Sequence, residues 1–327
     1  MSSQPKLLAI GLNPAYQRTL VFDHLAVGEV NRAVNEVISP GGKAVHCAIA
    51  ANTMFPGSAT VAAFYGGETG KAIQRQLADL GTPSIGIRVN EATRTCTTLV
   101  DQNAGVSTEL VGPSAPVSAN MADQMRDMLL AALPGFDALA LCGTYPSGID
   151  EALFIELAEA HGNKPLMLDA FRGVDRLLTT GRVNVLKINR QEAAALTGAS
   201  EPAAIAKAAF EQFALDALLL TDGPDTAWVF EPDSTWQIQP PRIHVLNPIG
   251  AGDTCAGVTM ARWLHGDSLP TAFAAGLAAA SASCLTLTGG QFDPAEAQRL
   301  AAEAVSTHCN VASRIEAPWI ACIARPQ

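Results

Sequence analysis

The sequence is short of charge, and the charge that it has is mostly acidic. Charged residues make up 16% of the 327 residues, and 31 acidic residues against 21 basic ones give a formal net charge of −10. A protein that binds nucleic acid normally carries a basic surplus or a basic stripe, and the sequence shows neither. We therefore expect no nucleic-acid partner, and an anionic ligand would need local basic residues to hold it.

A cysteine pattern for disulfides or zinc is also missing. The cysteines are odd in number, include no Cys-x-x-Cys and lie mostly in apolar runs. This pattern favours reduced, buried cysteines in a cytoplasmic protein over disulfides or a zinc site. The seven are Cys47, Cys96, Cys142, Cys255, Cys284, Cys309 and Cys322.

Long hydrophobic segments are absent as well. Residues 1–13 have neither a basic start nor a long apolar run, so we expect no signal peptide. The least polar stretch, Leu269–Leu287, is rich in Ala, Ser and Thr and contains a proline and a glycine, which predicts a packed helix rather than a membrane span. We therefore expect no membrane partner. Hydrophobic residues reach 48%, enough for the core of one large α/β domain or two small ones.

Short apolar runs alternate with amphipathic stretches through most of the chain. Several runs are apolar without alternation, which is typical of parallel strands covered on both faces. The expected strands are Leu7–Gly11, Ala59–Phe64, Ala138–Cys142, Leu166–Leu168, Val183–Ile188 and Ala217–Thr221, with a further extended run at Trp236–Val245. The expected helices are Ala44–Met54, Lys71–Leu80, Asn120–Leu133, Glu151–Ala160, Ala203–Phe213 and Thr254–His265. This order predicts a doubly wound α/β fold, with a mostly parallel sheet and helices on both faces.

Two segments interrupt this alternation. The first is roughly Arg18–Ser39. The second is roughly Arg94–Val111, in which β-branched runs flank an Asn/Gly turn at Asp101–Gly105, the pattern of a hairpin. Neither segment contains a helical stretch. We expect them to form a small β-sheet that projects from the main domain as a lid.

A glycine-rich turn before the last long helix is the sharpest chemical feature. Gly250, Ala251 and Gly252 let the backbone turn tightly, and Asp253 follows at the first turn of the helix. Backbone N–H groups at a helix N-terminus bind anions. Asp253 could then accept the proton of a hydroxyl that attacks phosphorus. The structural alternative is an ordinary turn with Asp253 as a helix cap.

A second glycine turn opens an earlier helix. Gly41 and Gly42 precede Lys43, a point charge suited to a phosphate. The spacing is not that of a Walker loop, and by itself a surface helix start is the more common explanation.

Together these motifs resemble the PfkB (ribokinase-like) carbohydrate kinase family over nearly the whole chain. Several shorter segments resemble its tagatose-6-phosphate kinase and 1-phosphofructokinase branch. They are Leu12-Asn13-Pro14, Gly28-Glu29-Val30-Asn31-Arg32, Thr93-Arg94-Thr95 and Thr108-Glu109-Leu110-Val111-Gly112-Pro113.

The resemblance implies one ribokinase-like domain over residues 1–327, with a lid at about 14–39 and 92–113. It implies that Asp253 is the general base and that residues 250–252 form the anion hole. Lys43 and Arg94 would hold the phosphate already present on a sugar, although either alone could be a solvated surface cation. The other residues that would bind substrate are Asn13, Gln17, Gly41, Gly42 and His46.

The resemblance also implies ATP and Mg²⁺ as cofactors and leaves a need for K⁺ open. Lys187, Asn189, Thr221 and Gly223 would bind the nucleotide, and Glu192 would order the metal. Each has a plainer interpretation, because an Asn-x-x-Glu spacing is common in helix caps and a strand often ends in a Thr-Asp-Gly turn. Asp169 ends a strand, where ligand sites gather, but it could equally be a buried structural aspartate.

Three departures from the family pattern fall in the expected sugar pocket. Gln17 replaces the usual aspartate, Ala44 replaces the last glycine of Gly-Gly-Lys-Gly, and His46 replaces the usual asparagine. Glutamine and histidine can still hydrogen-bond to hydroxyls, but the glutamine supplies no charge. These changes concern the acceptor more than the reaction.

The function that we expect is ATP-dependent phosphorylation of a sugar phosphate, of the tagatose 6-phosphate or fructose 1- or 6-phosphate type, to a bisphosphate. A kinase for an unphosphorylated sugar or nucleoside is one alternative, and a degenerate nucleotide- or sugar-binding sensor is another. An oxidoreductase is disfavoured, because no Gly-x-Gly-x-x-Gly follows the first strand. A projecting lid would leave an exposed sheet edge, so we expect a homodimer through the lid.

Overall fold

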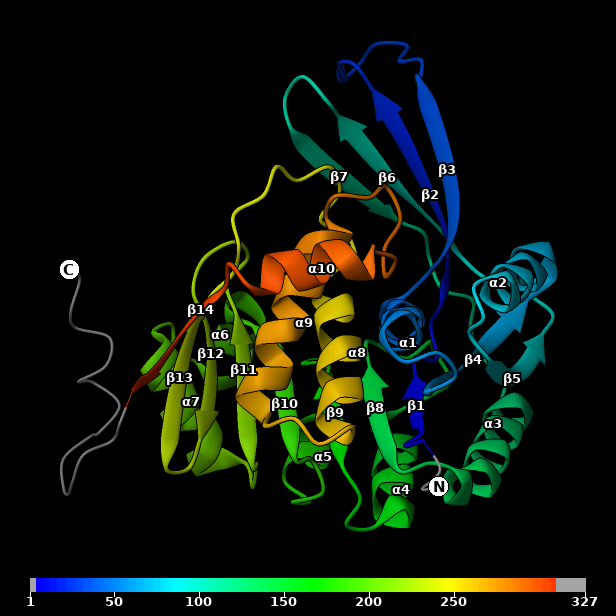
Figure 1. Ribbon diagram of the computed structural model, residues 1–327. Helices are drawn as coiled ribbons and strands as arrows, with labels where there is room; N and C mark the ends of the chain where they lie inside the picture. The colour runs from blue at the N-terminus through cyan, green and yellow to red at the C-terminus, as the bar shows by residue number, and fades with distance from the viewer. Residues whose placement is uncertain (1–3, 310–327) are drawn as a thin grey trace.

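The computed structural model describes residues 4–309 and contains two separate sheets (Figure 1). The larger sheet has ten strands in the described part of the chain. Across the sheet they are β14 (Val305–Cys309), β13 (Ser234–Gln239), β12 (Ala227–Glu231), β11 (Ala217–Thr221), β10 (Val185–Asn189), β9 (Leu166–Asp169), β8 (Ala138–Cys142), β1 (Leu7–Ile10), β4 (Ala59–Gly66) and β5 (Ser84–Val89). All neighbours from β11 to β5 are parallel, whereas β12, β13 and β14 form an antiparallel extension.

The parallel strands are buried on both faces, which explains their unbroken apolar sequences. Every residue of β1 and β8 is buried. One face is covered by α1 (Lys43–Met54), α2 (Gly67–Asp79), α8 (Ala251–Leu264) and α9 (Leu269–Ser283), with α10 (Pro294–Ala301) packed on α9. The other is covered by α3 (Ala119–Ala132), α4 (Glu151–His161), α5 (Asp175–Leu178), α6 (Arg190–Thr197) and α7 (Pro202–Gln212). The predicted α/β fold with helices on both faces is confirmed.

Glycines set the spacing between the helices that carry the candidate site. A Cβ atom on Gly257 of α8 would lie 2.1 Å from the backbone oxygen of Cys47 on α1. A Cβ on Gly276 of α9 would lie 2.3 Å from the Oγ1 atom of Thr259. Only glycine permits such an approach, so α1, α8 and α9 pack almost backbone to backbone.

The second sheet consists of the two predicted insertions. Its order is β3 (Asn35–Gly41), β2 (Ala15–Phe22), β6 (Thr95–Asp101) and β7 (Val106–Val111). A parallel pairing of β2 with β6 joins the two distant segments. Figure 1 shows this sheet projecting beyond the main sheet above α1, and the hairpin turn between β6 and β7 contains Gly105 with a φ of +64°.

Some predicted boundaries were wrong. The extended run Trp236–Val245 was too long, because β13 ends at Gln239 and the next two residues are prolines, which cannot donate to a ladder. The helix expected at Thr254 begins three residues earlier, at Ala251. Asp253 therefore lies within the first helical turn.

The described residues agree with the expected cysteine state. Cys47, Cys96, Cys142, Cys255 and Cys284 are buried and unpaired. The side chain of Cys309 and the whole of Cys322 lie outside the described part, as do residues 1–3. No helix within residues 4–309 has both the length and the hydrophobicity to cross a bilayer.

Candidate active site

The start of α8 presents two free backbone donors. Gly250 caps the helix in a left-handed conformation with φ +81°. The N–H of Ala251 donates to the oxygen of Pro248 at 3.2 Å, and that of Thr254 to the oxygen of Gly250 at 2.8 Å. The N–H groups of Gly252 and Asp253 make no hydrogen bond within residues 4–309. If this turn is an anion hole, as the sequence predicts, Gly252 and Asp253 are its donors and Ala251 is not.

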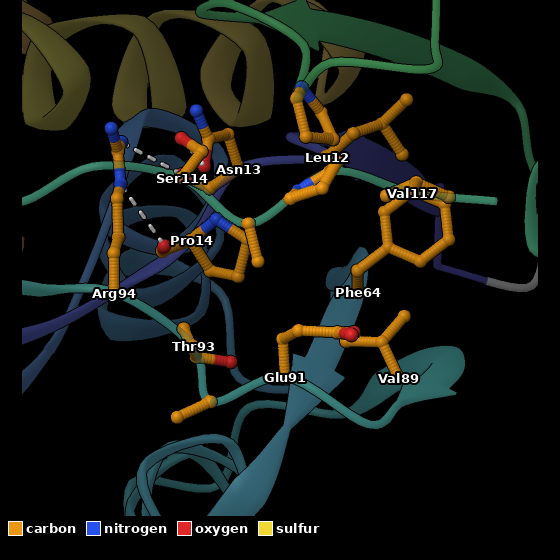
Figure 2. Close-up of a pocket in the computed structure, with 14 residues that line it drawn as sticks. Leu12, Asn13, Pro14, Phe64, Val89, Glu91, Thr93, Arg94, Ser114 and Val117 are labelled. Atoms are coloured by element: carbon orange, nitrogen blue, oxygen red, sulfur yellow. Dashed lines mark hydrogen bonds between the residues drawn. The ribbon is translucent and has the colours of Figure 1, made fainter.

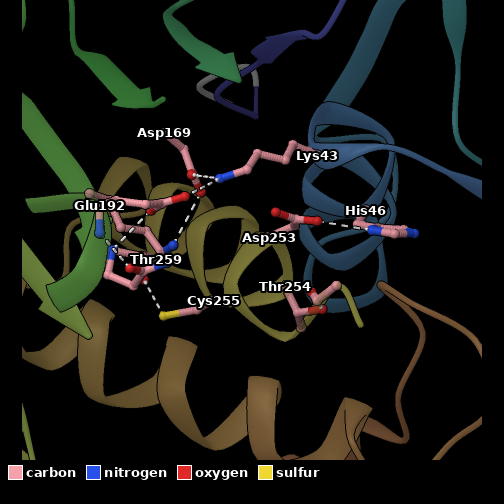
Figure 3. Close-up of polar contacts among 11 residues, drawn as sticks. Lys43, His46, Asp169, Glu192, Asp253, Thr254, Cys255 and Thr259 are labelled. Carbon is pink, nitrogen blue, oxygen red and sulfur yellow. Dashed lines mark hydrogen bonds and ion pairs between the residues drawn. The ribbon is translucent and has the colours of Figure 1, made fainter. Parts of the chain in front are cut away.

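The side chain of Asp253 contacts a residue of α1. Its Oδ2 atom is 3.0 Å from Nδ1 of His46 (Figure 3). The Asp253 side chain is 13% exposed and the His46 side chain 4%, so the carboxylate keeps access to solvent while the ring is enclosed. The contact was not predicted from the sequence.

Two lysines flank the buried carboxylate of Asp169. Lys43 Nζ lies 2.6 Å from Oδ1 (Figure 3), and Lys187 Nζ lies 3.1 Å from Oδ2. Burial alone would lower the pKa of each lysine, but the neighbouring acidic groups, Asp169 first among them, together outweigh it and hold both pKa values above their ordinary range. Burial would raise the pKa of Asp169, but the two lysines hold it low. All three groups are therefore charged near neutral pH, and the trio has a surplus of one positive charge.

A cavity of about 360 Å³ opens beside this trio. The ends of β10 and β11, the start of α6 and the start of α8 line it, and they bring together Lys187, Asn189, Glu192, Thr221, Gly223 and Gly252, with Lys43 and Asp169. The predicted nucleotide-binding residues therefore all meet in one place. They lie at the carboxyl ends of parallel strands, where ligands of open α/β sheets bind.

Asn189 and Glu192 form the capping box of α6. The Asn189 side chain accepts from the N–H of Glu192 at 2.8 Å, and the Glu192 carboxylate accepts from the N–H of Asn189 at 3.1 Å. The plainer interpretation of this spacing is thus observed. The other oxygen of Glu192 lies 3.7 Å from Lys43 Nζ.

A second cavity, of about 160 Å³, lies on the other side of Lys43. It is lined by Asn13, Gly42, Ala44 and Arg94, together with the loop after β8. Lys43 lines both cavities. The carboxylate of Asp253 helps to raise the pKa of Lys43, and Gly252, its neighbour in the chain, lines the larger cavity.

Arg94 is held by the loop that begins the lid (Figure 2). Its Nη2 donates to the oxygen of Asn13 at 3.0 Å, and its Nε donates to that of Pro14 at 3.4 Å. The Asn13 side chain accepts from Ser114 Oγ at 2.8 Å. Arg94 also lines a smaller recess of about 30 Å³ next to this cavity. These bonds position the guanidinium, but they also occupy two of its nitrogens.

Comparisons with known proteins give the family. A family profile described as "pfkB family carbohydrate kinase" matches residues 5–296. The chain belongs to the PfkB family of carbohydrate kinases. Enzymes of this kind transfer a phosphoryl group to a sugar hydroxyl.

Solved structures of related kinases share the fold. Phosphofructokinase-2 from Escherichia coli, solved with substrates and products, superposes with a TM-score of 0.83 at 22% identity, covering 91% of this chain and 99% of that one. A possible 1-phosphofructokinase from Thermotoga maritima gives 0.82 at 18%, covering 93% and 100%. A ribokinase from Thermotoga maritima gives 0.73 at 18%, covering 90% and 99%. The ribokinase-like architecture is therefore confirmed.

Two of the residues at which this PfkB kinase departs from the family pattern contact matching residues nearby. A Cβ on Gly11 would lie 2.5 Å from the Cβ of Ala44, so the methyl group of Ala44 fills space that Gly11 leaves. Gln17 is 4% exposed and donates from Nε2 to Thr98 Oγ1 at 2.8 Å. Its amide is thus already engaged inside the lid, and its predicted contact with a sugar stays a prediction.

Two features of the site could not be found by sequence reasoning alone. Asp169 carried only the weak signal of an acidic residue at a strand end. The His46–Asp253 contact carried none, because the two residues lie 207 positions apart. Only the packing of α1 on α8 brings them together.

Proposed function

We propose that this PfkB kinase transfers the terminal phosphoryl group of ATP to a hydroxyl of a sugar phosphate, giving a bisphosphate. The observation that carries the proposal is the arrangement of two cavities that share Lys43, with Gly252, the residue before Asp253, in the lining of the larger one. The cavity beside Lys187 and Asn189 would hold the nucleotide. The cavity beside Asn13 and Arg94 would hold the acceptor.

Asp253 would act as the general base. His46 occupies Oδ2, so Oδ1 would accept the proton of the acceptor hydroxyl while that oxygen attacks phosphorus and the ADP oxygen leaves. The N–H groups of Gly252 and Asp253 would donate to the transferring phosphoryl group. Lys43 and Lys187 would balance its charge, which is the main requirement of phosphoryl transfer.

Arg94 with Lys43 favours a phosphorylated acceptor over a free sugar. A guanidinium beside a sugar-sized cavity suits a phosphate. This feature also favours the tagatose-6-phosphate kinase and 1-phosphofructokinase branch. The acceptor residues Gln17 and His46 differ from the family pattern, so the sugar itself has to be found by assay.

The residues present fit a magnesium ion that is carried by the nucleotide. The described residues contain no cluster of three His, Cys, Asp or Glu side chains that could cage a metal. Mg²⁺ typically keeps several waters and uses one or two carboxylates beside substrate phosphates. Glu192, whose side chain is 17% exposed in the nucleotide cavity, would hold it in this way. When bound, the ion would offset phosphate charge.

The lid favours a homodimer. Val27, Val30, Val34, Val106, Leu110 and Val111 are exposed on or beside its strands, and an exposed apolar sheet invites pairing. One comparison structure is a tetrameric inhibited form of the Escherichia coli enzyme. Light scattering on the purified chain would give its own oligomeric state.

The deciding experiment is an ADP-release assay with Mg-ATP. The acceptors are tagatose 6-phosphate, fructose 1-phosphate, fructose 6-phosphate and the matching free sugars, each in K⁺ and in Na⁺ buffer. Turnover with a phosphorylated ketose would support the proposal. Turnover with free sugars alone would overturn the phosphate-binding role of Arg94. Silence across the panel with ATP still bound would favour a sensor.

A further inference from the structure

His46 is a buried ring with one polar contact. It lies one helical turn after Lys43 on α1 and points toward the start of α8 (Figure 3). Nδ1 faces Asp253 Oδ2 at 3.0 Å, whereas Nε2 is buried and has no hydrogen-bond partner within residues 4–309.

This geometry selects one tautomer. An ionised carboxylate only accepts hydrogen bonds, so Nδ1 must carry the proton for the contact to be a hydrogen bond. The contact with Asp253 therefore requires the proton on Nδ1, and Nε2 is the ring nitrogen without a partner in the described residues.

Three glycines leave room for the ring and for nothing larger. A Cβ on Gly250 would lie 2.8 Å from Nδ1, and a Cβ on Gly289 would lie 2.6 Å from Nε2. A Cβ on Gly290 would lie 2.9 Å from the Cα of His46. Gly250 and Gly290 also have positive φ angles, +81° and +77°. The ring is thus held from the loop before α8 and from the loop after α9, and its direction toward Asp253 is determined by backbone.

We propose that His46 is a positioning residue for Asp253: its Nδ1–H holds Oδ2 and so directs Oδ1 toward the acceptor hydroxyl. The inference rests on the proposed role of Asp253 as base. In this role His46 keeps its proton and acts on the acceptor only through Asp253, in place of the direct contact with the acceptor that the sequence predicts. Its contribution comes from orientation, because a carboxylate that is free to rotate would present the correct oxygen for only part of the time.

Two variants of almost equal shape test the donor directly. His46→Asn keeps an N–H donor near the place of Nδ1, whereas His46→Leu has a similar branched shape and no donor. With the phosphorylated ketose that the assay panel identifies, we expect His46→Leu to lower kcat by about tenfold to a hundredfold, the equivalent of one hydrogen bond to a charged group. We expect His46→Asn to stay within about threefold of the unmodified enzyme, and the KM for ATP to change in neither.

A double variant tests whether His46 acts through Asp253. In an Asp253→Asn background, His46→Leu should cause no further loss of kcat, because the carboxylate that it positions is gone. Equal kcat in the Asn and Leu variants, or a full additional loss in the double variant, would overturn the proposal.

A matched control is His161, another buried histidine. It lies on α4, on the opposite face of the sheet. His161→Asn should leave kcat and both KM values unchanged. A loss of kcat equal to that of His46→Leu would mean that the effect is one of general stability, and the proposal would fall.

Ring ¹⁵N NMR of histidine-labelled enzyme separates this inference from the proposed function. The resonances of His46, assigned by their loss in His46→Leu, should show a protonated Nδ1, and Asp253→Ala should shift Nδ1. If the enzyme is silent with every acceptor but shows this pattern, the proposed acceptor class fails and the His46–Asp253 bond stands. The opposite tautomer would overturn the bond whatever the turnover.

Discussion

The proposed nucleotide side and the proposed acceptor side of the site are built in different ways. On the nucleotide side, buried charges and a capping box sit at the ends of β9, β10 and β11 in the main sheet. On the acceptor side, Asn13, Gln17 and Arg94 belong to the lid or to the loops that enter it. The side that resembles the family most closely rests on the rigid sheet. Of the three departures from the family pattern, Gln17 lies on β2 of the small sheet, whereas Ala44 and His46 are buried on α1. The change at Gln17 thus lies on an insertion outside the main sheet, and the changes on α1 are accommodated by glycines that face them.

The largest expected effect lies where the two sides meet. Asp253→Asn should lower kcat by roughly two to four orders of magnitude, the size of a general-base effect, while nucleotide still binds. Steady-state kinetics and nucleotide titration measure the two quantities. Turnover close to that of the unmodified enzyme would mean that another group is the base.

The next largest effect is a loss of folding stability from a change on the nucleotide side. Asp169→Asn leaves Lys43 and the fully buried Lys187 without their carboxylate, and we expect a loss of about 3–5 kcal/mol in the free energy of unfolding, as for a broken buried ion pair. Denaturant unfolding measures it. The exposed pair of Glu68 and Lys71 is the control, because Glu68→Gln should hardly move the midpoint.

The ion pairs of Asp169 also predict how folding stability depends on pH. The lysines lower its pKa in the folded state, so its contribution to stability is complete above about pH 4, the ordinary pKa of an aspartate, and is lost as the pH falls toward the folded-state value. This part of the acid dependence should vanish in Asp169→Asn. An identical pH profile in both proteins would show that Asp169 is not ionised in the fold.

The acceptor side should respond in KM. Arg94→Ala should raise the KM for a phosphorylated sugar by about tenfold to a hundredfold, the equivalent of a charge-assisted hydrogen bond, and leave the KM for ATP unchanged. Arg94→Lys keeps the charge and should lose less. An equal rise for phosphorylated and free sugars would point instead to the support that Arg94 gives to the Asn13–Pro14 loop.

The smallest effect returns to the nucleotide side. Asn189→Ala removes the cap of α6, which should cost about 1 kcal/mol of stability and raise the KM for ATP but not for the sugar. Arg94→Ala is the reciprocal test, because it should raise the KM for the sugar but not for ATP. A rise in both KM values from either variant would mean that the two sides are not separable.

Much of the fold followed from local pattern. The unbroken apolar runs identified the parallel strands, because strands covered on both faces need no polar face. The hairpin residues identified the lid, and the glycine turns indicated the starts of α1 and α8 to within three residues. Predicted boundaries were wrong where one local signal overrode another. Pro240 and Pro241, for example, end β13 inside an otherwise strand-like run.

The sequence by itself determined the family, the layered α/β fold and most of the residues that line the larger cavity, since periodicity, glycine turns and motif spacing are properties of the chain in order. The tertiary structure alone decided which distant residues are in contact. Lys43 pairs with Asp169 across 126 positions, and His46 meets Asp253 across 207. Those contacts depend on backbone-close packing of α1 on α8 and on a shared sheet edge, and such distances are set by the whole core rather than by any one segment.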